Sequence, residues 1–205
     1  MSFSIIAAVG KNRELGKNGG LIFKLPTDLK FFKDTTMGHP VLVGKRTFKS
    51  LPGMLPGRKH YVVTRTGVDT FSPKHSVASL AVFDGARLSS QGSSPVRRIA
   101  RRKRDVAIAD VGENGQALIL VNDLDKFISE HQDSPEEIFV IGGGMIYKQL
   151  LDYADKLYLT EVDAEDPGAD TFFPWFDKTK YNRVELGKGE DNGIKFTFVR
   201  YDKIK

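Results

Sequence analysis

Short, continuous apolar runs recur along the chain and constrain its fold more than any other feature. Runs of this kind are typical of strands that are buried on both faces of a sheet. Helix-like segments lie between several of them, as parallel strands require. The sequence therefore predicts an α/β fold with a central, twisted, mostly parallel sheet and flanking helices. The runs cover residues 3–9, 40–44, 60–64, 117–121, 137–141 and 156–160.

The C-terminal part of the chain has a different pattern. Residues 181–186 and 194–202 alternate in polarity, and a turn rich in Gly, Asp and Asn separates them. This pattern predicts an antiparallel hairpin, which we expect at one edge of the sheet.

Helix signals follow several of the strands. Pro26 and Thr27 stand at cap positions of a helix that we expect to end near Gly38. Further helices are expected over 45–50, over 123–131 with Asp123 as its cap, and from Gly144 to about residue 153. Residues 10–20 contain four glycines and are expected to form an easily bent loop.

The length of 205 residues fits a single domain, 1–205. The strand–helix pattern degrades over 66–116, which we interpret as an insertion. Residues 97–104 of this segment carry six positive charges, and subtracting six from the formal net charge of +5 leaves −1. The block has no interleaved aromatic residues, which argues against stacking on single-stranded nucleic acid. We interpret it as a solvated segment.

Several classes of protein are excluded by composition. The chain has no cysteine, so it has no disulfide, no catalytic thiol and no Cys-ligated metal. The four histidines show no metal-ligand spacing, so we expect no metal site and place them on the surface or in loops. No apolar run is long enough to span a membrane, and the N-terminus does not resemble a signal peptide. We expect a cytoplasmic protein with no membrane partner.

Two strands end in glycine where a helix is expected to begin: Gly44 precedes Lys45, and Gly142, Gly143 and Gly144 precede Met145. Such turns let a phosphate approach the backbone, and two of them in one sheet suit a dinucleotide. Neither matches a Walker A or Gly-x-Gly-x-x-Gly motif. The glycines could equally serve only to make tight connections.

Asp28 lies in the first turn of its expected helix, on the same face as Phe32. A carboxylate at this position either caps the helix or belongs to a site. Spacing alone favours capping.

Taken together in order, several stretches resemble the dihydrofolate reductase family. The resemblance covers 1–65 and 117–205. It implies NADPH-dependent reduction of 7,8-dihydrofolate to 5,6,7,8-tetrahydrofolate, a step of one-carbon metabolism. Hydride would pass to pterin C6, and N5 would be protonated through a water. The matching stretches include Ile5–Ala8, Asn12–Gly16, Leu25–Lys33, Leu55–Arg58, Ile141–Gly144 with Tyr147, Tyr158–Thr160 and Asp170–Pro174.

The resemblance implies roles at the substrate. Asp28 would bond the pterin N3 and 2-amino group, and Thr160 would support the same end through a water. Arg58 would pair with the α-carboxylate of the substrate's glutamate. Burial of Asp28 among apolar neighbours would raise its pKa. These neighbours are Ile6, Leu29, Phe32 and Leu51.

The resemblance also implies an NADPH site. Its residues would border the nicotinamide, hold the two ends of the pyrophosphate, or bind the adenosine 2′-phosphate. Those at the nicotinamide are Ala8, Leu15, Gly16, Gly19 and Gly20, within a loop over 10–24 that would close on the cofactor. Those at the pyrophosphate are Gly44, Lys45, Arg46, Thr47, Gly142, Gly143, Gly144, Met145, Ile146 and Tyr147. Those at the 2′-phosphate are Thr64 and Arg65.

One departure from the family lies near the expected site. The family usually has Pro-Trp where this chain has Ile22 and Phe23. Phe23 cannot donate the hydrogen bond that would hold a water near Asp28, so catalysis could be slower.

Two other functions are compatible with the sequence. One is a riboflavin-pathway pyrimidine reductase of the same fold, which would not need the Leu25–Lys33 or Leu55–Arg58 runs. The other is a weakened relative whose basic insertion binds nucleic acid. For the reductase we expect a monomer that binds dihydrofolate and antifolates such as methotrexate or trimethoprim.

Overall fold

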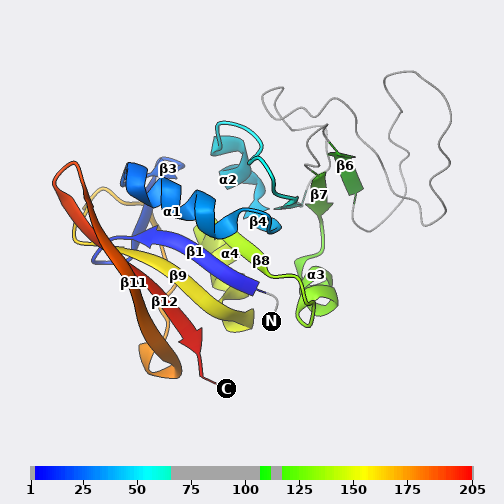
Figure 1. The fold of residues 1–205 in the computed structure, drawn as a ribbon. Coiled ribbons are helices and arrows are strands. Elements are labelled where there is room, and N and C mark those ends of the chain that lie inside the picture. The colour runs from blue at the N-terminus through cyan, green and yellow to red at the C-terminus, as the bar shows by residue number, and fades with distance from the viewer. Residues whose placement is uncertain (1–2, 66–106, 112–116, 205) are drawn as a thin grey trace, which may run out of the picture.

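A computed structural model describes residues 3–65, 107–111 and 117–204. Within them, nine strands form one sheet in the order β11-β12-β9-β1-β8-β4-β5-β7-β6 (Figure 1). The six central strands, from β9 to β7, are parallel. The predicted α/β fold with a mostly parallel sheet is confirmed. These strands are β1 (Phe3–Val9), β4 (Val41–Gly44), β5 (His60–Val63), β7 (Ala117–Val121), β8 (Ile138–Gly142) and β9 (Ala154–Val162).

Both edges of the sheet are antiparallel. β11 (Tyr181–Asp191) and β12 (Ile194–Lys203) form the predicted C-terminal hairpin, and β12 pairs with β9. Asn192 and Gly193 make its turn with φ of 53° and 77°, a conformation that favours these two residue types. At the opposite edge, β6 (Ala107–Val111) runs antiparallel to β7.

Helices cover the two faces of the sheet. On one face, α1 (Pro26–Thr36) and α2 (Lys45–Ser50) pack on an apolar cluster that includes Phe48, Val43 and Phe139. On the other face, α3 (Leu124–His131) and α4 (Gly144–Leu150) enclose a larger cluster. The 3₁₀ turn η3 (Leu151–Tyr153) continues α4, as predicted for the end of that helix, and η4 (Lys178–Lys180) precedes β11.

The expected loop over 10–20 is partly strand. β2 (Glu14–Lys17), β3 (Gly20–Leu21) and β10 (Thr171–Phe172) form a small antiparallel sheet. The prediction was wrong here because β10, the partner of β2, lies far away in the chain.

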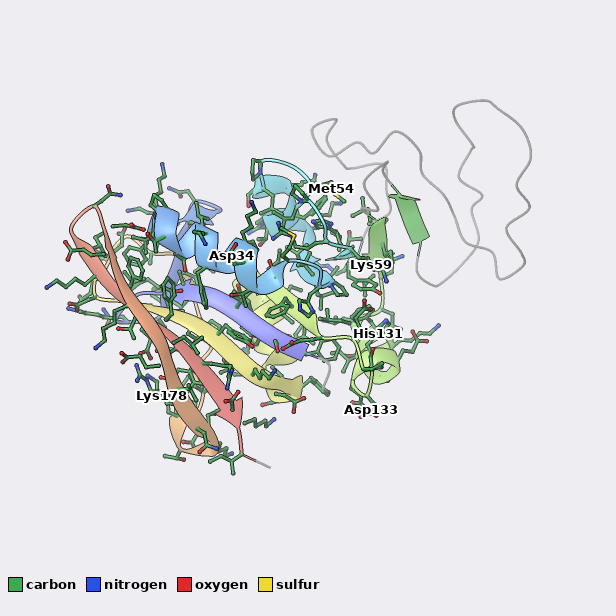
Figure 2. All side chains as sticks on the ribbon, viewed as in Figure 1. Asp34, Met54, Lys59, His131, Asp133 and Lys178 are labelled. Carbon is green, nitrogen blue, oxygen red and sulfur yellow. The ribbon has the colours of Figure 1, made fainter. Side chains whose placement is uncertain are left out.

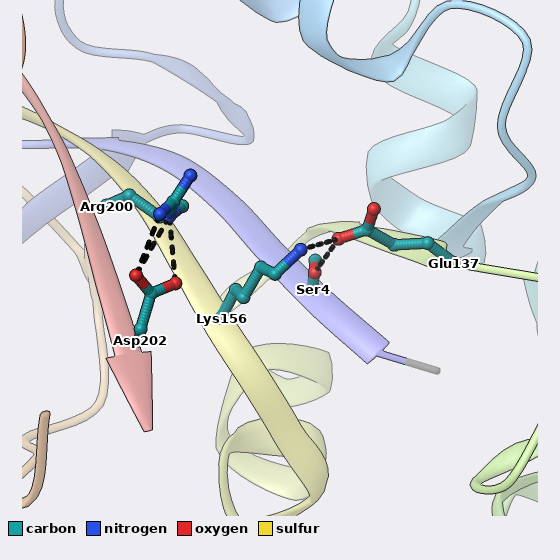
Figure 3. A network of polar contacts seen from close by, with 5 residues as sticks. All are labelled: Ser4, Glu137, Lys156, Arg200 and Asp202. Carbon is teal, nitrogen blue, oxygen red and sulfur yellow. Dashed lines mark hydrogen bonds and ion pairs between the residues drawn. The ribbon is translucent and has the colours of Figure 1, made fainter. Parts of the chain in front are cut away.

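A row of polar side chains crosses the sheet near the N-terminal end of β1 (Figure 3). Ser4 Oγ donates a 2.5 Å hydrogen bond to Glu137 Oε1, and Lys156 Nζ lies 3.4 Å from the same oxygen. On β12, the guanidinium of Arg200 donates to both carboxylate oxygens of Asp202 at 2.8–3.1 Å. Each charge in this row has an opposite charge beside it, so the row stabilises the sheet and offers no ligand site.

His60 corrects the expectation that all histidines lie on the surface or in loops. It lies in β5 with no exposed surface, and burial lowers the pKa of its ring to about 4. Its Nε2 accepts a 3.0 Å hydrogen bond from the amide of Leu55, which requires the neutral ring. The run over 60–64, which predicts a buried strand, was a local signal for this burial, whereas the absence of metal-ligand spacing says nothing about exposure.

The expected insertion over 66–116 lies largely outside the described residues, as does its basic block 97–104. Among the described helices, none has the length and apolar character needed to cross a bilayer.

Candidate active site

Asp28 and Thr160 meet at the centre of the site. Asp28 lies in the first turn of α1 and is half-buried, and Thr160 lies in β9 and is buried. Thr160 Oγ1 donates a 2.5 Å hydrogen bond to Asp28 Oδ1. No side chain at the N-cap position, Leu25, caps α1. The Asp28 carboxylate is thus turned toward the sheet, and the site interpretation is favoured over capping.

The electrostatic setting of Asp28 favours its neutral form. Burial raises the pKa of this carboxyl, the hydrogen bond from Thr160 opposes the shift, and the nearby Asp191 adds to it. Tyr147 lies close enough for its own pKa to be raised further by Asp28, although burial is the main cause. The raised pKa makes this carboxyl a better proton acceptor than an ordinary aspartate, as a group that takes part in proton transfer needs.

An apolar wall accompanies Asp28, with one exception to the expected set. Ile6, Phe32 and Leu51 belong to the cluster between α1, α2 and the sheet. Leu29 does not join them, because 53% of its side-chain surface is exposed. The expectation that Leu29 helps to bury Asp28 is wrong: in α1 it points away from the cluster into solvent.

Arg58 stands at the far end of this wall. It is buried, and burial lowers the pKa of its guanidinium. Its Nη1 donates to Thr36 Oγ1 at 2.8 Å and its Nε to the Pro56 carbonyl at 3.1 Å, and the guanidinium lies 5.8 Å from the centre of the Phe32 ring. Among the described residues, these bonds use two of its five N–H groups, so the guanidinium has further donors that suit an anionic group.

The two glycine turns come together on the other side of β1. A Cβ on Gly143 would lie 2.8 Å from Thr47 Oγ1, and a Cβ on Gly44 would lie 3.1 Å from Ile146 Cγ1. Gly142 has a φ of 121°, and its peptide bond to Gly143 is cis. Tyr147 Oη donates a 2.8 Å hydrogen bond to the Ile6 carbonyl and so ties α4 to β1 beside Asp28. The turns form one backbone cradle, in which a side chain would collide at Gly143 and be tightly packed at Gly44.

The other expected cofactor residues lie around this cradle. Met145 is largely exposed, Lys45 is half-buried and Arg46 is exposed at the start of α2. Thr64 is buried at the end of β5, where its amide donates to Val121, and Arg65 follows it on the surface. Cationic side chains beside a tight backbone turn suit an anionic, phosphate-bearing ligand.

The segment after β1 is held by residues that the sequence did not single out. Asp170 Oδ2 accepts a 2.7 Å hydrogen bond from the amide of Asn18, and the Asp170 amide donates to the carbonyl of Gly16. Glu14 is buried and accepts from the amide of Asn12. The only indication of Asp170 in the sequence analysis is that it lies in a stretch, Asp170–Pro174, that resembles the family. Within this segment lie Leu15, Gly16, Gly19 and Gly20, and β1 carries Ala8.

Phe23 lies beneath the N-terminus of α1. It packs with Ala8 on the cluster of Leu25, Val162 and Phe198. Its half-buried ring fills space near Asp28 and offers no donor.

A separate cavity of about 540 Å³ lies between the ends of β1 and β9 and the segment 173–178. None of the expected site residues lines it. Lys11 lies 2.8 Å from Asp163 and Lys178 lies 3.3 Å from Glu161, while Arg13 Nη1 donates to the Phe173 carbonyl at 3.0 Å. Figure 2 shows Lys178 beside the β11–β12 hairpin and well apart from α1. The cavity is therefore distinct from the site at Asp28.

Comparisons with known proteins agree with this geometry. The family model for dihydrofolate reductase matches residues 2–86 and 93–203. A dihydrofolate reductase of Bacillus subtilis is 31% identical, covering 98% of this chain and 94% of its own length. One of Haloferax volcanii is 31% identical, covering 98% and 83%, and one of Neisseria gonorrhoeae is 29% identical, covering 98% of each.

Fold and site together define an α/β oxidoreductase that uses a reduced nicotinamide cofactor. The chain belongs to the dihydrofolate reductase family. The family and the enzyme class predicted from the resemblance are confirmed, and neither alternative function is favoured.

Proposed function

We propose that this enzyme reduces 7,8-dihydrofolate to 5,6,7,8-tetrahydrofolate with NADPH as the hydride donor. The observation that carries the proposal is the Asp28–Thr160 pair, held beside the glycine cradle by the Tyr147–Ile6 hydrogen bond. An acid that can bind a heterocycle and a cradle that can bind phosphates thus stand on either side of β1.

At the substrate, Asp28 accepts hydrogen bonds from N3 and the 2-amino group of the pterin. Thr160 fixes the rotamer of this carboxylate and keeps the charge at the correct edge of the ring. Ile6, Phe32 and Leu51 exclude water from the ring faces, and Leu29 lies at the solvent-exposed rim. Arg58 pairs with the α-carboxylate of the glutamate tail through its remaining donors.

The raised pKa of Asp28 matters for the proton that N5 must receive. With its raised pKa, the Asp28 carboxylate is a stronger hydrogen-bond acceptor than an ordinary aspartate, so it can bind and polarise the pterin while a water protonates N5. Phe23 leaves that water without an indole partner, and we propose that this slows proton delivery.

We assign the cradle to the diphosphate of a dinucleotide, because Gly44 and Gly143 are the N-cap residues of α2 and α4 and present backbone without side chains at two helix starts. When bound, NADPH supplies the hydride for pterin C6. Thr47, Lys45 and Arg46 hold one end of the diphosphate, and residues 144–147 hold the other. Ala8 and the segment from Leu15 to Gly20 border the nicotinamide, while Thr64 and Arg65 bind the 2′-phosphate.

A methotrexate titration followed by protein fluorescence tests the substrate site, with dihydrofolate-dependent NADPH oxidation as the activity readout. We expect stoichiometric binding and turnover. A chain that binds no antifolate but oxidises NADPH with a ribosylaminopyrimidine phosphate would instead be the riboflavin-pathway enzyme.

Arg65→Ala tests the cofactor assignment. It removes an exposed cation at the end of β5, so the Michaelis constant should rise more for NADPH than for NADH. Lys59→Ala, which removes a cation before the same strand, is the matched control and should leave the ratio unchanged. Equal effects of Arg65→Ala on both cofactors would exclude Arg65 as the 2′-phosphate ligand.

We also propose that the enzyme is a cytoplasmic monomer of one domain, 1–205, with an insertion at about 66–116 and without nucleic-acid binding. Size-exclusion chromatography and a salt-dependent nucleic-acid binding assay would test these points.

A further inference from the structure

The N-terminus of α1 is capped from a distant part of the chain. Its N-cap residue, Leu25, supplies no side-chain acceptor. Instead, Asp191 Oδ2 accepts a 2.8 Å hydrogen bond from the amide of Thr27, and Asp191 Oδ1 accepts one from Thr27 Oγ1, also at 2.8 Å. The Asp191 carboxylate therefore caps the N-terminus of α1, although Asp191 lies in β11, 164 residues from Thr27 in the sequence.

The geometry of the hairpin turn holds Asp191 in place. Asp191 ends β11, and Asn192 and Gly193 follow with positive φ. The side-chain amide of Asn192 donates to the carbonyl of Lys24 at 3.4 Å. The turn thus contacts the chain on both sides of the start of α1.

The same hairpin also pairs with β9, the strand that carries Thr160, the hydrogen-bond partner of Asp28. Phe198 of β12 pairs in register with Thr160, and its ring stacks on Phe31 of α1 with the ring centres 4.2 Å apart. Asp28 follows Thr27 directly in the sequence. The hairpin therefore contacts α1 at its first turn through Asp191 and one turn later through Phe198, while β12 also holds the strand that carries Thr160.

We propose that Asp191 is a positioning residue for the reaction: by capping α1 through Thr27, it sets the place of the Asp28 carboxylate relative to Thr160 and the pterin. This inference rests on the proposed function, since it concerns the role of Asp28 there. Asp191 does not touch the reacting atoms in this scheme and acts through Thr27.

The negative charge of Asp191 supplies a second readout. The described groups that act on Asp28 are Thr160 on β9, Asp191 on β11 and the neutral Tyr147 on α4. Of these, only Asp191 adds a like charge, and it raises the pKa of Asp28. Removing that charge should lower the apparent pKa of Asp28, whether or not the cap remains.

Two variants separate the cap from the charge. Asp191→Asn loses the charge but keeps one oxygen acceptor, and Asn caps helices about as well as Asp. Asp191→Ala loses both. Glu190→Ala is the matched control, because it removes one exposed carboxylate from the neighbouring position without a hydrogen bond to α1 among the described residues.

The measurements are kcat and KM for dihydrofolate, the pH dependence of dihydrofolate binding without cofactor, and amide exchange at Thr27. Loss of a cap is typically equivalent to about a five- to thirtyfold change in an equilibrium. We expect Asp191→Ala to lower kcat/KM by a factor in that range and to speed exchange at Thr27. Asp191→Asn should restore most of kcat/KM, while both variants lower the apparent pKa.

A merely structural cap would lower the melting temperature of Asp191→Ala and leave kcat/KM as in Glu190→Ala, even though the loss of charge shifts the pH profile. That result overturns the inference. If the unaltered enzyme failed to reduce dihydrofolate, the proposed function would fail first, and the exchange rate at Thr27 would still report the cap.

Discussion

At the scale of single residues, the burial of Asp28 affects both the binding site and the free energy of unfolding. The pKa of Asp28 is raised, so the folded protein holds its proton more tightly than the unfolded chain does. A carboxyl with a raised folded-state pKa lowers the free energy of unfolding as pH rises through that pKa. Where Asp28 is ionised and can bind the pterin as an anion, its burial therefore lowers the free energy of unfolding.

Asp28→Asn should separate these two effects. An amide can still accept the hydrogen bond from Thr160 but cannot carry the charge that binds the pterin. We expect turnover to fall by about 10²- to 10⁴-fold and the free energy of unfolding at pH 7 to increase. Steady-state assays and urea denaturation measure the two quantities. Asp34→Asn, on the exposed side of α1, is the control. Wild-type turnover in Asp28→Asn would remove Asp28 from the site.

His60 predicts a pH dependence of opposite sign. Its pKa is about 4 in the folded protein, against 6.5 for the free side chain. The unfolded chain therefore binds the proton first on acidification, and the stability contributed by the neutral ring is complete above pH 6.5 and is lost as pH falls toward 4. The full loss is about 3 kcal/mol.

The measurement is the free energy of unfolding between pH 4 and 7. His60→Gln retains an acceptor at the position of Nε2 for the Leu55 amide and cannot titrate in this range, so its stability curve should be flatter than that of the wild type. His131→Asn, a change at the end of α3, should keep the wild-type slope. A wild-type slope in His60→Gln would show that another group unfolds the protein in acid.

At the scale of elements, local patterns were sufficient for most of the fold. β1 and α2 coincide with their predicted ranges, and Asp123 caps α3 by accepting from the amide of Lys126. The misses all depend on distant partners. The strand character of Glu14–Lys17 requires β10, and the cap of α1 requires Asp191, neither of which has a local signal. For the same reason, the placement of Asp28 and Thr160 at the same end of the pterin was expected from the family resemblance and not from spacing, and their direct hydrogen bond was not expected.

The hydrogen bonds that join Asp170, just before β10, to Gly16 and Asn18 lead to a prediction at the scale of elements. Asp170 bonds the amide of Asn18 and the hydroxyl of Thr171. Without the carboxylate, the segment that we propose borders the nicotinamide loses a fixed contact. Asp170→Ala should therefore raise KM for NADPH and lower kcat/KM by roughly two- to tenfold. Glu165→Ala removes an exposed carboxylate from the same connection without a hydrogen bond to β2 among the described residues. Equal kinetics of the two variants would show that the Asp170 side-chain contacts do not support the cofactor site.

At the scale of the whole molecule, every residue of the site comes from 3–65 or 117–204. The site is assembled from both sides of the predicted insertion, through the parallel pairing of β4, β5, β7 and β8. The insertion joins β5 to the far edge of the sheet, where β6 lies beside β7. Its composition shows that the segment from Ser89 to Asp105 is rich in Ser, Gly, Pro and basic residues.

Replacing Ser89–Asp105 with a short Gly/Ser linker should leave a folded enzyme that binds methotrexate, because such segments bury little and β6 begins after the deleted part. The linker variant loses six positive charges from 97–104. If these charges attract the phosphates of NADPH over a distance, the dissociation constant should rise modestly at low salt. The two proteins should then converge as the Debye length shrinks to about 3 Å near 1 M salt. The measurement is the NADPH dissociation constant against salt for both proteins. A difference that persists at high salt would mean direct contact between the block and the cofactor, and a variant that does not fold would mean that the segment packs into the core.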